Sequence, residues 1–170
     1  MIPPQRPLYA MAKLPLDVQA QIAALPRTSR ARPPELLHMT LLAFVDLADF
    51  PPEFVAVLMK TLAGFEAEAF DVAFDTIVER EAVTLRASKP LSAARALQRR
   101  MRDFLKRHDF PWFGGAPVPH VTLNYHRDGL GDQRIDPIAW RVEEIFLIES
   151  IYGATRHEPR GRLPLHRPML

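Results

Sequence analysis

The apolar residues of this chain recur with two different spacings, and each spacing predicts one kind of secondary structure. Spacings of three and four residues predict helices over residues 16–25, 54–65 and 91–108, because residues so spaced share one face of a helix. The third helix is the clearest, since Leu97 and Met101 share its apolar face while several arginines occupy the opposite face.

Short stretches that alternate between apolar and polar residues, or that are almost wholly apolar, predict strands. The predicted strands cover residues 7–14, 36–45, 70–74, 83–87, 120–125, 142–150 and 161–166. Proline-rich loops over residues 26–34 and 111–119 precede the second and fifth strands, and a polar turn is expected after residue 125. Helices and strands interleave without a short repeat, which predicts a mixed helical and stranded domain over residues 1–170.

The composition excludes several kinds of chemistry. The 170 residues are 48% hydrophobic, enough for a substantial core, and contain no cysteine. A disulfide framework, a thiolate nucleophile and a cysteine-ligated metal site are therefore excluded. The first residues do not resemble a secretion signal, and no segment has the roughly 20 apolar residues of a membrane span. We expect a cytoplasmic protein without a membrane partner.

The charges are nearly balanced but unevenly distributed. The net charge is +2. Residues 1–94 carry 9 basic and 11 acidic residues, whereas residues 95–170 carry 13 and 9. This excess of positive charge is compatible with an anionic ligand such as a nucleotide or an RNA end, and it is also common on solvated surfaces.

One tetrapeptide pattern occurs twice. His38-Met39-Thr40-Leu41 lies in the second predicted strand, and His120-Val121-Thr122-Leu123 lies in the fifth. With 7 Thr and 21 Leu in the chain, two such matches among 6 His arise by chance roughly once in a few thousand sequences. The pair is therefore a motif that needs a chemical explanation.

The spacing of the motif predicts a site for a phosphodiester. Side chains two residues apart on a strand point to the same face, so each copy presents an imidazole and a hydroxyl together. If the two strands lie side by side, a neutral imidazole can take a proton from water while a protonated one gives a proton to the leaving oxygen. The hydroxyls of Thr40 and Thr122 would bind the phosphoryl oxygens.

Two plainer interpretations compete with this one. A single histidine on an apolar strand is most often an ordinary core or surface residue. Alternatively, His38 and His120 could bind zinc, with His126 as a third ligand. No Asp or Glu lies near either motif at a ligand-like spacing, and the two threonines would then have no role, so we expect no metal.

At these residues the chain resembles the 2H phosphoesterase superfamily, in its bacterial 2′-5′ RNA ligase-like, or RNA 2′,3′-cyclic phosphodiesterase, branch. The resemblance covers the first motif with its continuation to Phe44, the second motif with the preceding Pro119, and the order of elements along nearly the whole chain. It implies an α+β class and a bilobal pseudo-twofold fold. An antiparallel sheet would form each of two intertwined lobes, with helices on the outside and one motif per lobe.

The resemblance also implies an activity. Members of this branch hydrolyse a 2′,3′-cyclic phosphate on RNA or a nucleotide to the 2′-phosphate without a metal or cofactor, and some join RNA ends reversibly through a 2′-5′ linkage. Carried onto this chain, His120 becomes the general base for water and His38 the general acid for the departing 3′ oxygen. Thr40 and Thr122 become the phosphate-binding hydroxyls.

The chain departs from the family pattern at one position and adds candidate aromatic residues. Several members carry an arginine two residues after the second motif, whereas here the next arginine is Arg127. Trp112 and Tyr125 are candidates for stacking on a base, while Phe44 and Tyr152 are expected in the core.

Two further functions stay open from the sequence. One is a noncatalytic module that binds RNA ends, and the other is a 2H esterase acting on a non-RNA cyclic or ADP-ribose-type phosphodiester. Catalysis is favoured because both copies keep His and Thr, whereas binding could rely on Arg or Lys. We expect a monomer, since the cleft would form within one chain.

Overall fold

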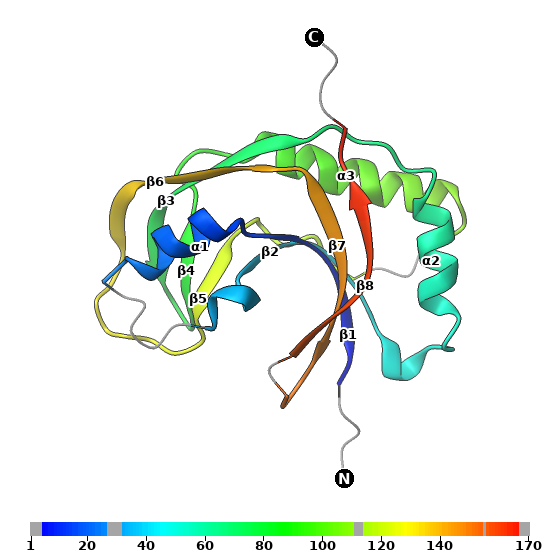
Figure 1. Cartoon of the computed structure of the whole chain (residues 1–170), viewed down its shortest axis with the longest axis horizontal. Coiled ribbons are helices and arrows are strands. Elements are labelled where there is room, and N and C mark those ends of the chain that lie inside the picture. Colours follow the sequence, from blue (N-terminus) through cyan, green and yellow to red (C-terminus); the bar gives the residue numbers. More distant parts are fainter. Residues whose placement is uncertain (1–4, 27–31, 111–113, 155, 167–170) are drawn as a thin grey trace.

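The strands assemble into one curved antiparallel sheet (Figure 1). The computed structural model describes residues 5–26, 32–110, 114–154 and 156–166. In these residues the sheet has eight strands in the order β6-β3-β4-β5-β2-β1-β7-β8. Their bounds are β1 (Pro7–Lys13), β2 (His38–Asp46), β3 (Phe70–Glu79), β4 (Val83–Arg86), β5 (Val121–Asn124), β6 (Gln133–Val142), β7 (Glu144–Ile151) and β8 (Arg156–Pro164).

The sheet consists of two antiparallel halves of four strands each. One half contains β6, β3, β4 and β5, and the other contains β2, β1, β7 and β8. The halves meet where β2 lies beside β5, through the single register pair Met39–Val121. Each half therefore carries one copy of the motif on its inner edge, and the expected α+β class with an antiparallel sheet in each lobe is confirmed.

The three predicted helices are present and lie on the sheet. They are α1 (Leu16–Ala23), α2 (Phe54–Leu62) and α3 (Ser92–Arg107), with short 3-10 turns η1 (Pro34–Leu36) and η2 (Leu47–Asp49). Helix α1 contacts β6, α2 contacts β8, and α3 contacts both β3 and β2. Because α3 buries its apolar face against strands of both halves, it ties the two halves together. No helix among the described residues is long and apolar enough to span a membrane.

The sequence-based assignment was wrong for one edge strand and too short for the other. Strand β6 replaces most of the expected polar turn, and β8 begins at Arg156 rather than Gly161. Both strands lie at the edges of the sheet, and most of their side chains are exposed or half-buried, so their apolar pattern is weak. Pro137 lies within β6, which an edge strand tolerates because an unpaired position needs no backbone donor.

Candidate active site

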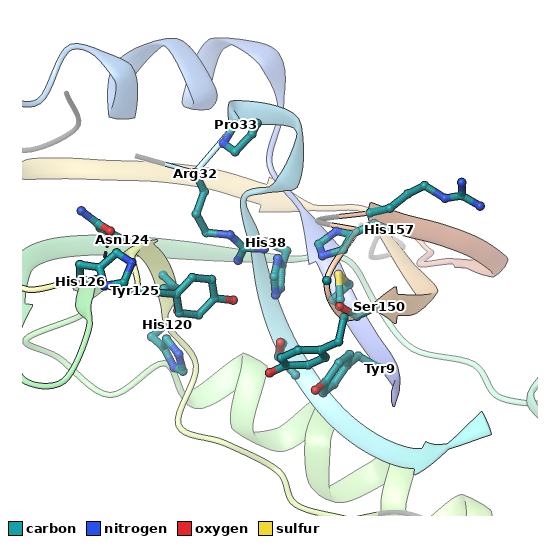
Figure 2. Close-up of a pocket in the computed structure, with 16 residues that line it drawn as sticks. Tyr9, Arg32, Pro33, His38, His120, Asn124, Tyr125, His126, Ser150 and His157 are labelled. Carbon is teal, nitrogen blue, oxygen red and sulfur yellow. Dashed lines mark hydrogen bonds between the residues drawn. The ribbon is translucent and has the colours of Figure 1, made fainter. Parts of the chain in front are cut away.

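The two motif copies face each other across the junction of the halves. Because Met39 pairs with Val121 in antiparallel register, His38 lies beside Thr122 and Thr40 lies beside His120. Side chains alternate along a strand, so these four point to the face opposite Met39 and Val121, which are fully buried. All four line one cleft of about 540 Å³ (Figure 2). The structure thus brings together the two imidazoles and two hydroxyls that the sequence singled out.

Both motif imidazoles are held by the same local hydrogen bond. His38 Nδ1 lies 2.7 Å from the Leu36 carbonyl oxygen, and His120 Nδ1 lies 2.8 Å from the Val118 carbonyl oxygen. A carbonyl oxygen only accepts, so each Nδ1 carries the hydrogen and donates it. In the neutral ring each Nε2 is then left with its lone pair, which is the atom that can accept or return a proton.

The surroundings of His38 favour its neutral form. The pKa of His38 is lowered to about 3, mainly by burial. The hydrogen bond to the Leu36 carbonyl opposes this shift, while Arg32, His157 and Lys13 add to it. In the free protein near neutral pH, His38 is therefore an uncharged imidazole.

Basic groups outside the motifs lie in or next to the cleft. Lys13 lies opposite His38 in the β1–β2 register, while Arg32, His157 and Arg156 line the cleft wall. No Asp or Glu is found among the described residues that line it. The cleft is therefore suited to an anionic ligand. Sequence reasoning missed these residues because they come from separate elements and share no motif.

The structure places one of the aromatic residues, Tyr152, differently from the sequence-based prediction. Tyr125 lines the cleft, is 61% exposed, and has the Arg32 guanidinium 4.9 Å from its ring centroid. Phe44 is in the core as expected, at 6% exposure. The expectation for Tyr152 was wrong: it is 64% exposed and lines the cleft, because it lies in the turn after β7 rather than in the sheet. Trp112 lies outside the described residues.

The structure also bears on the zinc interpretation and on Arg127. Among the described residues, no three His, Asp or Glu side chains are placed to hold a metal ion together. His126 lines the cleft, and its backbone N–H donates to Asn124 Oδ1 at 3.0 Å.

Arg127 is not among the residues that line the cleft. It donates from Nε to the Arg80 carbonyl oxygen at 2.6 Å.

A buried glutamine supports the motif strands from behind. Among the described residues β2 and β5 share one register pair, Met39–Val121, and backbone hydrogen bonds between the two segments resume where Ala43 bonds to Gly114 and Gly115. Gln98 of α3 fills the interval, donating from Nε2 to the Leu41 carbonyl oxygen at 3.0 Å and to the Pro117 carbonyl oxygen at 2.8 Å. One side chain thus connects the first motif strand to the segment that leads into the second.

Comparisons with known proteins agree with this architecture. A model of the 2′-5′ RNA ligase superfamily matches residues 14–152. No curated protein sequence matches the chain.

Among solved structures, E. coli LigT complexed with 3′-AMP is 23% identical, with a TM-score of 0.76, over 95% of this chain and 98% of that one. A crystal structure named phosphoesterase is 24% identical, with a TM-score of 0.73, over 96% of this chain and 99% of that one. The protein TT0787 of Thermus thermophilus is 17% identical, with a TM-score of 0.71, over 96% of this chain and all of that one. Other structures of E. coli LigT contain phosphate, NADP+ or ATP. These likenesses show a shared fold.

Proposed function

The chain belongs to the 2′-5′ RNA ligase superfamily, and from that premise we propose that it hydrolyses 2′,3′-cyclic phosphodiesters at RNA or nucleotide ends to 2′-phosphates. One observation carries the proposal: His38, Thr40, His120 and Thr122 line a single cleft whose described lining contains basic groups and no carboxylate. The nucleotide complexes of E. coli LigT support a nucleotide-like ligand.

The proposed reaction needs only the two imidazoles and the two hydroxyls. His120 Nε2 takes a proton from water as the water oxygen attacks phosphorus, and the bond from phosphorus to the 3′ oxygen breaks. His38 gives its proton to the departing 3′ oxygen, which leaves a 2′-phosphate and a free 3′ hydroxyl. Thr40 and Thr122 donate hydrogen bonds to the non-bridging oxygens, where negative charge develops. With a 5′ hydroxyl of RNA in place of water, the same steps form a 2′-5′ linkage.

This order of roles requires His38 to be protonated in the complex. Because the pKa of His38 is about 3 in the free protein, its proton must be gained together with the anionic substrate, whose charge offsets that of Arg32 and Lys13. Sulfate remains a dianion from pH 5 to 8, so it can stand in for the anionic phosphate group of the substrate over this range. We expect the NMR signals of the His38 ring to shift to those of an imidazolium when sulfate binds at pH 6. Ring signals that stay neutral would give the base role to His38.

The base of the substrate would lie against the exposed tyrosines. Tyr125 and Tyr152 both line the cleft and are mostly exposed, which suits them to stacking on a base worth roughly 1–3 kcal/mol. Trp112 stays a prediction. RNA ends occur inside the cell, so we also propose a cytoplasmic location, and we propose a monomer because the two motif copies meet in a cleft within one chain.

Turnover of a short RNA ending in a 2′,3′-cyclic phosphate, with EDTA present, tests the proposal. We expect the wild-type protein to form the 2′-phosphate. His38→Ala and His120→Ala should each lower kcat at least a hundredfold while the protein remains folded, which urea unfolding checks. His108→Ala, at an exposed histidine that does not line the cleft, is the matched control and should keep wild-type turnover.

Retained turnover in either motif variant would contradict the mechanism. Salt-sensitive RNA binding without product would instead indicate a binding module. Turnover of a non-RNA cyclic or ADP-ribose-type phosphodiester, without turnover of RNA, would indicate a 2H esterase with a non-RNA substrate.

A further inference from the structure

The cleft contains a histidine that belongs to neither motif. His157 of β8 lines the cleft and lies opposite Ser150 of β7, which also lines it. Its ring contacts that of His38 edge-on, with the centroids 5.1 Å apart and the planes at 70°. Figure 2 shows the two rings next to each other. His157 therefore lies beside the position at which a substrate phosphate would meet His38.

Lys13 determines which nitrogen of His157 carries the hydrogen. Lys13 Nζ lies 3.4 Å from His157 Nδ1 and 2.7 Å from the Glu35 carbonyl oxygen. An ammonium group only donates, so Nδ1 of His157 accepts and is unprotonated. Burial, together with the charges of Lys13 and Arg32, lowers the pKa of His157 to about 4, so the ring is neutral near pH 7. Its single hydrogen is then on Nε2.

This arrangement is the reverse of that in the motif histidines. In His38 and His120 the hydrogen is on Nδ1 and Nε2 has the lone pair, whereas His157 has its N–H at Nε2. A phosphoryl oxygen accepts hydrogen bonds, so it cannot bind a neutral nitrogen lone pair. It can bind the hydroxyls of Thr40 and Thr122, and it can bind His157 Nε2–H.

We propose that His157, held in this tautomer by Lys13, donates Nε2–H to a non-bridging oxygen of the substrate phosphate beside His38. The inference rests on the proposed function, because it names a further phosphate-binding residue of the same cleft. Lys13 is a positioning residue that acts through His157. The pair gives the cleft a hydrogen-bond donor beside His38 in addition to the two threonine hydroxyls.

The tautomers can be measured directly. In protein labelled with 15N in histidine, the ring nitrogen shifts and their couplings to ring protons distinguish Nδ1–H from Nε2–H. At pH 7.5 we expect His157 to give the Nε2–H pattern, and His38 and His120 the Nδ1–H pattern. In Lys13→Met the His157 pattern should move towards a mixture of the two. An Nδ1–H pattern for His157 in the wild-type protein would overturn the inference.

Binding of sulfate tests the donor independently of turnover. His157→Phe keeps a planar ring without a donor, and His157→Gln keeps an N–H donor at a similar reach. The loss of one hydrogen bond to a charged oxygen predicts sulfate affinity about tenfold to a hundredfold weaker in His157→Phe. His157→Gln should recover affinity to within about threefold, and His108→Phe, the matched substitution outside the cleft, should leave it unchanged.

The same variants separate this inference from the proposed function. With a cyclic-phosphate RNA we expect KM to rise in His157→Phe by the factor seen for sulfate, with a smaller change in kcat. Wild-type sulfate affinity in His157→Phe, or an equal loss in His157→Gln, would overturn the role of the donor. A wild-type protein that binds sulfate through His157 but does not turn over RNA would refute only the proposed function.

Discussion

Replacement of Gln98 by leucine tests whether α3 holds the two motif strands in place. Gln98 is 2% exposed and donates to the Leu41 and Pro117 carbonyl oxygens, while Arg95 donates to its Oε1 at 3.1 Å. Leucine has a similar volume but no polar group. Gln98→Leu therefore leaves the packing nearly intact and removes all three hydrogen bonds.

The expected loss of stability follows from where the two carbonyl groups lie. Leu41 is 0% exposed, so its carbonyl oxygen would be buried without a partner, at a cost of about 1–3 kcal/mol. Pro117 is half-buried and its carbonyl can reach water, so this loss is about 0.5–1.5 kcal/mol. We expect the free energy of unfolding to fall by about 1.5–4.5 kcal/mol.

Activity should fall as well, because the lost bonds lie next to the site. Leu41 follows Thr40 directly, and Pro117 is three residues before His120. With the segments no longer bridged, the two imidazoles lose their fixed separation, and we expect kcat to fall about tenfold at a temperature where the variant is folded.

Urea unfolding and turnover of the cyclic-phosphate RNA measure the two effects, and Arg95→Met is the matched control. The control removes the bond to Gln98 Oε1 but keeps both backbone carbonyl oxygens paired, so its loss of stability should be smaller than that of Gln98→Leu and its kcat should stay near that of the wild type. A Gln98→Leu protein within about 0.5 kcal/mol of the wild type, with unchanged kcat, would refute the bridging role.

Three further predictions concern other parts of the molecule. Tyr152→Ala should raise KM for a nucleotide substrate about fivefold or more and leave sulfate affinity unchanged, because it removes a stacking surface and no donor. Glu149→Gln should lower the free energy of unfolding at pH 7 by about 1–3 kcal/mol. Glu149 is 0% exposed, and burial by itself would raise the pKa of its carboxyl group. The hydrogen bonds from Arg6 and Arg160 have the larger effect and lower this pKa. That stabilisation is present above the ordinary glutamate pKa, so the difference from the wild type should shrink in urea unfolding below about pH 4.5. Because the pKa of His38 is lowered in the folded protein, the His38 ring takes up a proton on unfolding below about pH 6.5. The free energy of unfolding should therefore fall from pH 7 to pH 5, and it should fall less steeply in His38→Gln.

The fold could be predicted where the local pattern was strong. Helix α3 was assigned to within one residue at each end, because its apolar and basic faces repeat at the helical period over four turns. Strand β2 was found because it is almost wholly apolar. Strand β6 was missed, since its first five residues are exposed or half-buried and Pro137 interrupts the alternation of apolar and polar residues.

The four motif residues could also be singled out before the fold was known. Strand geometry requires His38 and Thr40 to share a face, and likewise His120 and Thr122, and these relations depend on spacing alone. The duplication of the pattern suggested that the two pairs belong together.

Only the tertiary structure decided how the two pairs meet and what surrounds them. The register of β2 against β5 places each imidazole beside a hydroxyl of the other copy, and Gln98 bridges the gap beyond it. Lys13 and His157 are 144 residues apart, yet they share a hydrogen bond beside His38. Spacing along the chain encodes the faces of single elements, whereas register, burial and the pKa of a buried imidazole depend on which elements pack together.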